Sequence, residues 1–307
     1  MKPNDYVKKI LARQTFDDDA RELKELQRRG KELEKLLRNH FSESSPKIRW
    51  GGSMAKRTMI RDSYDGDMIC YFPHGDTTAG ANLQEIYENT ERALGRDYVV
   101  ERKASALRVK DPSTTSIKGF AEDLHIDVVP GRFTDDAEQD VFLHRTTGEK
   151  ERLRTNLDMH IAHIRDSGVV DAIRLMKLWK DRNGLRNAKT FVLELLVVKF
   201  LRNRRSADLC TQLEHVWAEL RDSPDGLAVE DPANPSGNDL KPIVDECRSE
   251  LSTAARNTLW QIDERGWEAV FGPVDDDEVE GKGEDGRASL GAAAAQVLNP
   301  TKPWLCR

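Results

Sequence analysis

The sequence predicts an α/β + α protein with two lobes, one containing a mixed sheet and the other helical, preceded by a long N-terminal helix. Apolar residues recur at steps of three and four over 17–41, short extended runs surround one helical segment between about 45 and 135, and a helical period dominates from about 155 onward. We expect a substrate cleft between the lobes. The predicted regions are an N-terminal helix region at 1–44, the mixed lobe at 45–155 and the helical lobe at 156–307.

The first predicted element is one helix over 17–41. Three aspartates, Asp17 to Asp19, suit the positive end of a helix dipole, and Ser42 to Pro46 ends the pattern. The mixed lobe then has predicted strands at 48–50, 68–72, 98–101, 106–111 and 124–129 and a helix at 82–94. Predicted helices of the second lobe cover 169–183, 190–203, 209–222 and 242–263, with a loop rich in Pro, Gly and Asn at 224–239. An acidic stretch at 275–285 is expected to be a solvated surface loop.

Composition limits the class of protein. Hydrophobic residues make up 38% of the 307 residues and charged residues 33%, which is typical of a globular protein. No apolar run is long enough for a membrane span and the N-terminus lacks a signal-peptide apolar region, so we expect a cytoplasmic protein. The net charge of −6 argues against a protein that coats nucleic acid. Because no two of the four cysteines form a CxxC pair, we expect reduced, buried thiols at Cys70, Cys210, Cys247 and Cys306.

The segment GGSMAKRTMIRDSYDGDMICYF (51–72) carries the strongest chemical signal. Asp65 and Asp67 lie two residues apart at the start of a strand, so alternation places both carboxylates on one face. Like charges this close repel unless a cation lies between them, and Mg²⁺ is commonly held by one or two carboxylates. For an isolated Asp-x-Asp, however, turn or cap residues are the commoner interpretation.

Two further features strengthen the interpretation as a metal site. Asp127 lies in the middle of a strand with apolar neighbours; if that strand pairs beside 67–72, three carboxylates can hold two metals about 3.5–4 Å apart. Upstream, Gly52 and Ser53 follow a short strand and open a segment that can begin a helix. Phosphates bound by the free N–H groups there would lie beside the metals.

This combination of Gly-Ser, Asp-Gly-Asp and a later strand aspartate resembles the DNA polymerase β-type nucleotidyltransferase superfamily. IRLMKLWK (173–180) and TFVLELL (190–196) resemble helices of the 2′-5′-oligoadenylate synthetases and of bacterial cyclic GMP-AMP synthase-like enzymes (CD-NTases). DPANPSGND (231–239), which includes Asp231 and Asn238, resembles a loop of the oligoadenylate synthetases. The resemblance covers about 40–262 and implies a polymerase β-like lobe, a helical lobe of the oligoadenylate synthetase type and an N-terminal spine helix.

The resemblance implies an enzyme that joins ribonucleoside triphosphates, ATP among them, into a cyclic di- or trinucleotide messenger with release of pyrophosphate, in bacterial anti-phage (CBASS) signalling. It implies that Asp65, Asp67 and Asp127 bind two Mg²⁺ or Mn²⁺ ions, and that Asp127 helps to deprotonate the attacking hydroxyl. It also implies that the triphosphate is held by Gly52, Ser53, Lys56 and Lys177, although Lys177 could instead face solvent. A regulatory protein partner is compatible with this branch, nucleic-acid activation is less favoured, and no membrane partner is expected.

Three alternatives remain open. One is nucleotide addition to an RNA end, which would favour a broad basic groove; the second is linear 2′-5′ oligoadenylate synthesis; the third is a catalytically silent nucleotide-binding scaffold. The basic strand residues that could steady a polyanion are Arg102, Lys103, Arg108 and Lys110, for which a solvated strand face is the simpler explanation. His160 and His163 have a spacing that can bind metal on a helix, but packing or surface roles are commoner, and Trp179 is expected in a core or interface.

Overall fold

The computed structural model describes residues 1–112, 124–148 and 150–274. The chain forms two compact units. An α/β unit consists of Thr15–Val170 and Val229–Leu240, and a helical unit consists of Met1–Gln14, Asp171–Ala228 and the described residues from Lys241 onward. The acidic stretch at 275–285 and Cys306 lie outside the described residues.

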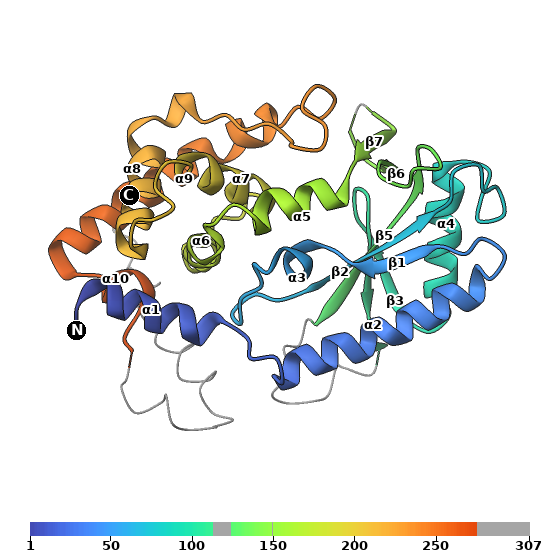
Figure 1. Ribbon diagram of the computed structural model, residues 1–307, viewed down its shortest axis with the longest axis horizontal. Coiled ribbons are helices and arrows are strands. Elements are labelled where there is room, and N and C mark those ends of the chain that lie inside the picture. Colours follow the sequence, from blue (N-terminus) through green and yellow to red (C-terminus); the bar gives the residue numbers. More distant parts are fainter. Residues whose placement is uncertain (113–123, 149, 275–307) are drawn as a thin grey trace, which may run out of the picture. The chain divides into compact units, whose positions relative to one another are not determined.

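The α/β unit is built on one mixed sheet of seven strands (Figure 1). The strand order is β1-β2-β5-β4-β3, and β6 pairs with β5 and β7. Strands β2 and β5 are parallel, and every other pair in the sheet is antiparallel. The strands are β1 (Lys47–Trp50), β2 (Gly66–Phe72), β3 (Val99–Arg102), β4 (Leu107–Lys110), β5 (His125–Phe133), β6 (Val141–His144) and β7 (Arg152–Thr155).

The helices described beside this sheet are α2 (Arg21–His40), α3 (Gly52–Lys56), α4 (Leu83–Leu94) and α5 (Leu157–Arg165). Alternate residues of β2 point to opposite faces, as the period of a strand requires. Met68, Cys70 and Phe72 pack into the core with α2 and α4, whereas Ile69 and Tyr71 join Phe133, Val141 and Leu143 in a second cluster. The even-numbered side chains of β2 therefore face the main core, and Asp67 lies on the opposite face of the strand.

Two glycines make room for Trp50 at the end of β1. A Cβ atom on Gly30 of α2 would lie 2.2 Å from the Trp50 ring, and one on Gly66 of β2 would lie 2.7 Å from it. Because side-chain atoms do not approach this closely, the indole occupies the space that a larger residue would need. The glycine between Asp65 and Asp67 is thus required by packing.

The helical unit contains α1 (Pro3–Gln14), α6 (Val170–Arg182, of which Val170 itself falls in the α/β unit), α7 (Thr190–Phe200), α8 (Leu209–Asp222), η2 (Pro224–Gly226), α9 (Lys241–Arg265) and α10 (Glu268–Phe271). Its core contains an aromatic group centred on Trp217, which is fully buried and lies 6.1 Å from Trp179 and 5.7 Å from Trp267 between ring centroids. Trp179 is buried and donates a hydrogen bond to Thr258 at 2.8 Å, so the predicted core position of Trp179 is confirmed. In α1, the Tyr6 hydroxyl donates to the Gly272 carbonyl at 2.6 Å.

Most of the predicted elements are present, with shifted ends. The helix expected over 17–41 begins only at Arg21, because Asp17 to Asp19 form the turn before it; Asp17 pairs with Arg61 at 3.5 Å. The fold class is confirmed: a mixed sheet with helices and a separate helical unit. Cys70, Cys210 and Cys247 are free and buried, as predicted.

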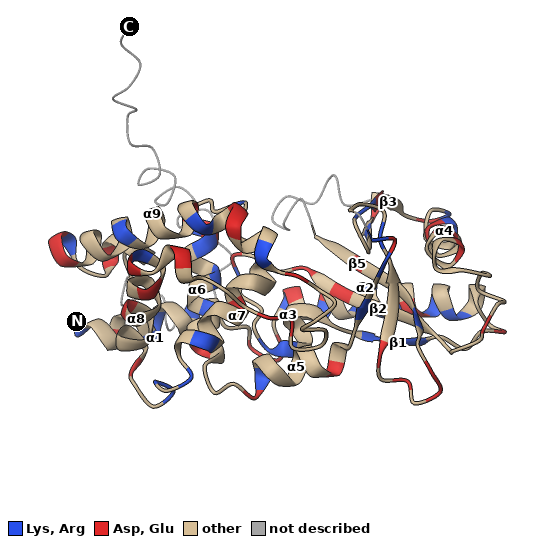
Figure 2. Cartoon of the chain, turned by 90° about the horizontal axis from the view of Figure 1, so that it is seen from above, with Lys and Arg blue, Asp and Glu red and all other residues tan. Residues whose placement is uncertain are grey.

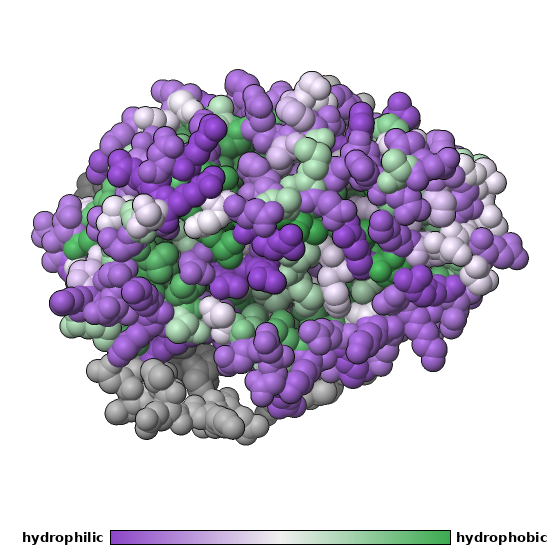
Figure 3. Space-filling view, in the orientation of Figure 1, coloured by the Kyte–Doolittle hydropathy of each residue, from purple (hydrophilic) through white to green (hydrophobic). Residues whose placement is uncertain are grey.

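On the face of the molecule that Figure 3 shows, hydrophilic residues predominate. Four large apolar side chains are exposed in the described residues, namely Met1, Val99, Met159 and Trp260. None of the described helices combines the length and the apolar character that crossing a bilayer demands.

Candidate metal and nucleotide site

Cross-strand register assembles a row of charged side chains on the sheet. Asp67 of β2 is the register partner of Asp127 in β5, and Arg108 of β4 is the partner of Asp127 on the other side. The predicted pairing of the Asp127 strand beside 67–72 is therefore confirmed. Ile126 and Val128 point into the core, so alternation places Asp127 on the face opposite to it.

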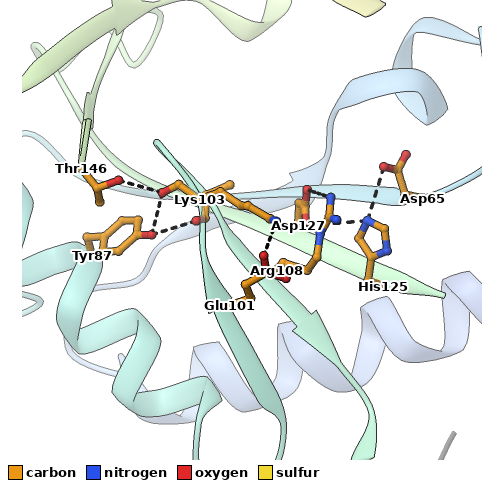
Figure 4. Close-up of polar contacts among 9 residues, drawn as sticks. Asp65, Tyr87, Glu101, Lys103, Arg108, His125, Asp127 and Thr146 are labelled. Atoms are coloured by element: carbon orange, nitrogen blue, oxygen red, sulfur yellow. Dashed lines mark hydrogen bonds and ion pairs between the residues drawn. The ribbon is translucent and has the colours of Figure 1, made fainter. Parts of the chain in front are cut away.

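His125 lies on the same face of β5 as Asp127, two residues away (Figure 4). Its Nε2 atom is 3.5 Å from Asp65 Oδ2 and 4.0 Å from Asp127 Oδ1. The histidine and Asp127 side chains are 12% and 15% exposed, while Asp65, just before β2, is 45% exposed. One ligand atom from each of these three residues lies within 4.8 Å of the other two.

Asp67 lies against the backbone of Gly52 at the start of α3. A Cβ atom on Gly52 would fall 1.6 Å from Asp67 Oδ2, and Gly52 has a φ of +47°, in the left-handed region that favours glycine. The Gly51 N–H donates to the Asp67 carbonyl at 2.7 Å, which fixes the strand and the turn together. The Gly-Ser turn and the second aspartate of the motif are thus in direct contact. In the part of the chain that the structure describes, Asp67 is not a member of the compact Asp65–His125–Asp127 set.

Arg108 forms a two-pronged ion pair with Asp127. Its Nε and Nη2 atoms donate to the two carboxylate oxygens at 2.9 and 3.0 Å. The hydrogen bond to Asp127 raises the pKa of Arg108 against the opposing effect of burial. The guanidinium already neutralises the carboxylate that the sequence predicts as a metal ligand.

The predicted phosphate-binding residues lie in both units. Ser53 and Lys56 are in α3, and Lys56 is only 8% exposed. The pKa of His163 in α5 is lowered by burial and by the charges of His160 and Lys56. Lys177 is in α6 of the helical unit and is 7% exposed, so the solvent-facing alternative for this lysine is wrong.

The segment 229–240 is fastened within the α/β unit through Asp231, which is 1% exposed. Asp231 Oδ1 lies 2.7 Å from His160 Nε2 and accepts from the Ala233 N–H at 2.9 Å, and Oδ2 accepts from Asn238 at 2.6 Å. Burial opposes ionisation, but the hydrogen bonds from His160 and Asn238 outweigh it and lower the pKa of Asp231. His160 therefore helps to hold Asp231 in place through a polar contact.

The basic strand residues are mostly paired with acids. Arg102 is bonded to Glu91 at 2.5 Å, Lys103 to Glu101 at 2.5 Å and Arg108 to Asp127. Figure 2 shows acidic and basic residues interspersed along the elements of both units. This region therefore presents a largely neutralised strand face.

Sequence reasoning proposed the three aspartates and the Gly-Ser turn as site residues, but it did not predict that His125 lies beside Asp65 and Asp127 or that Arg108 pairs with Asp127. The signal for His125 was available: it precedes Asp127 by two residues on one strand and must share its face. The Arg108 pair depends on the register between β4 and β5, which residue spacing along the chain does not specify.

Comparison with known proteins gives matches among solved structures only: no protein-family model and no curated protein sequence matches the chain. The CD-NTase CdnG of Bradyrhizobium diazoefficiens, solved with GTP, aligns with a TM-score of 0.67 at 13% identity, over 96% of this chain and 98% of that chain. Escherichia coli MS115-1 CdnC with ATP aligns with a TM-score of 0.63 at 18% identity, over 89% and 98% of the two chains, and has also been solved in a CdnC:HORMA-deltaN complex.

The chain has the CD-NTase fold. A third structure with this fold, the Vibrio cholerae DncV cyclic AMP-GMP synthase with a linear intermediate, aligns with a TM-score of 0.58 at 18% identity, over 76% of this chain and 68% of that chain. The polymerase β-like architecture implied by the Gly-Ser, Asp-Gly-Asp and Asp127 pattern is confirmed at the level of the fold.

Proposed function

We propose that the protein is a metal-dependent nucleotidyltransferase that joins ribonucleoside triphosphates into a cyclic oligonucleotide and releases pyrophosphate. The observation that carries this proposal is the register of β2 and β5, which sets Asp67 beside Asp127 where Gly52 contacts Asp67. The CD-NTase fold supports it, because that fold is shared with a cyclic AMP-GMP synthase.

The donor set fits a divalent metal. Carboxylate oxygens are hard ligands of the kind that Mg²⁺ and Mn²⁺ take, and the Asp65 and Asp127 oxygens converge with His125 within 4.8 Å. We propose that Asp65, Asp67 and Asp127 hold two Mg²⁺ or Mn²⁺ ions. When bound, such ions neutralise charge on the attacking and leaving oxygens of an in-line phosphoryl displacement.

The residues of the chain supply position and charge. Gly52 lets the backbone approach closely, and Ser53 and Lys56 follow it in α3, so these three are proposed to hold the triphosphate. For Lys177, a role in binding the triphosphate is proposed from the sequence resemblance alone. Asp127 is proposed to accept the proton of the acceptor hydroxyl as that oxygen bonds to the α-phosphorus. The bond from the α-phosphorus to the bridging oxygen breaks, and pyrophosphate leaves. Orientation and electrostatic stabilisation account for most of the rate in such a reaction.

We further propose that the product is an adenine-containing cyclic di- or trinucleotide that serves as a second messenger in bacterial anti-phage (CBASS) signalling. CdnC with ATP and CdnG with GTP support ribonucleoside triphosphates as the substrate class. The CdnC:HORMA-deltaN complex supports a regulatory protein partner. A cytoplasmic location agrees with these substrates.

Nucleotide addition to an RNA end is the second choice. It calls for an open basic groove, whereas Arg102, Lys103 and Arg108 each have a carboxylate partner. A silent nucleotide-binding scaffold is disfavoured because all three acids are present and two of them are register partners.

The test is a direct analysis of products. The protein is incubated with ATP, GTP, CTP and UTP plus Mg²⁺ or Mn²⁺, treated with phosphatase and examined by mass spectrometry. We expect phosphatase-resistant cyclic oligonucleotides from the wild type and none from the Asp65→Asn, Asp67→Asn double variant. The matched control is Asp136→Asn, an exposed acid of the loop between β5 and β6, which should retain full activity.

Turnover by a folded double variant would refute the metal assignment. Incorporation of labelled nucleotide into added RNA, with no cyclic product, would replace the proposed reaction by the RNA-end alternative.

A further inference from the structure

His125 occupies a position that the predicted three-carboxylate site does not use. It begins β5 and shares a face with Asp127 because two residues separate them on one strand. Its side chain is 12% exposed, less than either acid near it. A largely buried imidazole ring thus lies beside two carboxylates of the proposed metal centre (Figure 4).

The donor atoms are close enough together to converge on a single ion. His125 Nε2 lies 3.5 Å from Asp65 Oδ2 and 4.0 Å from Asp127 Oδ1. In an octahedron with ligands at about 2.1 Å, neighbouring ligand atoms are roughly 3.0 Å apart and opposite ones about 4.2 Å apart. Both measured separations lie between these two values, and all three ligand atoms lie within 4.8 Å of one another, so the side chains would adjust their positions to bind one ion.

The chemistry of the set differs from that of three carboxylates. Imidazole nitrogen is a good ligand for first-row transition metals, whereas Mg²⁺ prefers oxygen ligands and water. Mn²⁺ accepts both carboxylate and imidazole ligands. A nitrogen donor in this place therefore favours Mn²⁺ relative to Mg²⁺.

We propose that His125 is a ligand of the metal centre, through Nε2, beside Asp65 and Asp127, and that it gives the centre a preference for Mn²⁺ over Mg²⁺. This inference rests on the proposed metal-dependent function and adds a ligand and a selectivity to that site.

The test observes the metal itself. Full-length protein is stripped with a chelator, loaded with one equivalent of Mn²⁺ without nucleotide, and examined by electron spin-echo envelope modulation. We expect ¹⁴N modulation typical of coordinated imidazole, replaced by a ¹⁵N pattern when the protein is made with ¹⁵N-histidine. His125→Gln, which offers an oxygen donor, should lose the nitrogen signal, while the matched control His163→Gln should keep it.

Affinity gives a second readout. We expect His125→Gln to weaken Mn²⁺ binding by on the order of tenfold and Mg²⁺ binding, measured by competition, much less. Wild-type protein with bound Mn²⁺ and no nitrogen modulation would overturn the proposal without requiring any variant to fold. So would an unchanged ratio of Mn²⁺ to Mg²⁺ affinity in folded His125→Gln.

The two proposals fail separately. Cyclic products from a protein whose Mn²⁺ shows no nitrogen coupling would refute the role of His125 and leave the enzyme assignment standing. Nitrogen coupling without any nucleotide product would establish the ligand and show that the chain alone, without a regulatory partner, does not carry out the proposed reaction.

Discussion

At Gly52, the backbone conformation and the close contact with Asp67 both require a glycine. Its positive φ and the 1.6 Å approach of a Cβ to Asp67 Oδ2 are separate obstacles to any side chain. A left-handed conformation costs an ordinary residue about 1–2 kcal/mol, whereas a clash with Asp67 displaces a carboxylate that the proposed mechanism needs.

Comparison of Gly52→Ala with Gly75→Ala separates these effects. Gly75 also has a positive φ, of +77°, but open space surrounds its Cβ position. We expect both variants to lose about 1–2 kcal/mol in urea unfolding from strain, Gly52→Ala to lose more than Gly75→Ala because of the clash with Asp67, and Gly52→Ala alone to lose nearly all nucleotidyltransferase activity. Equal activity in the two variants would show that the contact with Asp67 is unimportant.

Arg108 competes with any cation that binds Asp127. Charges this close interact by a few kcal/mol at an effective dielectric constant near 20, and partial exposure reduces that value. We expect Arg108→Gln to bind Mn²⁺ more tightly, on the order of tenfold (about 1.4 kcal/mol), in calorimetric titration without nucleotide. Arg102→Gln, which breaks the exposed pair with Glu91, is the control and should leave metal affinity unchanged. Weaker metal binding in Arg108→Gln would show that Arg108 positions Asp127 for the metal.

At the residue scale, sequence reasoning was strongest where one short segment carries the pattern. Asp65 and Asp67 are two residues apart, and the Gly-Ser turn is just upstream. It was weakest for contacts set by register: Arg108 reaches Asp127 from another strand, and Gly66 is required by the Trp50 ring. Such requirements come from packing between segments, which spacing along the chain does not contain.

Among the elements, the segment 229–240 depends most on one buried acid. Asp231 accepts hydrogen bonds from two side chains and one backbone N–H. Lys150 and Asn234 add further bonds, to the Gly237 and Arg154 carbonyls at 2.9 and 3.0 Å, beside a cavity of about 560 Å³ lined by Lys150, Arg152 and Arg154. The loop is thus fixed to α5 and β7.

We expect the substitution Asp231→Asn to lower the free energy of unfolding by an amount that depends on pH. Since the folded state lowers the pKa of Asp231, its contribution to stability is complete above the ordinary pKa of about 3.9 and disappears as pH falls through the lower folded value. We expect the variant to lose about 1–3 kcal/mol in urea unfolding at pH 7, and the difference from wild type to shrink below about pH 4. Asp166→Asn, an exposed acid of the same unit, should show almost no loss. A pH-independent difference would mean that ionisation of Asp231 contributes nothing.

Sequence periodicity predicted most of the helices and strands but missed helix α1 and the two short strands β6 and β7. The helices of the second unit and strands β2 and β5 carry enough apolar residues to show their period. Helix α1, and strands β6 and β7 with four residues each, were not predicted. In RLRT, the sequence of β7, only one residue is apolar, so pairing with β6 and not hydrophobicity defines the strand.

At the scale of the whole molecule, the charge pattern predicts weak contact with nucleic acid. The net charge is −6 and the basic strand face is largely paired. We expect labelled RNA, measured by fluorescence anisotropy, to bind weakly and with a log–log salt slope shallower than about −2, since each phosphate contact contributes about −0.7 for single strands. Cyclic product formation should not require added RNA or DNA. A steep slope together with dependence on nucleic acid would favour the activated or RNA-end alternatives.

The order in which the units are interleaved along the chain has a consequence for biosynthesis. The chain passes between units after Gln14, Val170, Ala228 and Leu240, so each unit is assembled from separated stretches. During translation, the sheet is complete by Thr155, yet Asp231 reaches it only after a large part of the helical unit has been made. Helix α1 is synthesised first, but the hydrogen bond from the Tyr6 hydroxyl to the Gly272 carbonyl can form only after Gly272 has been synthesised. Since domains generally fold as units on the ribosome, the α/β unit should stay incomplete until Leu240 has been made, and the helical unit until α10 has been made. For the same reason, neither unit can be expressed as one uninterrupted fragment.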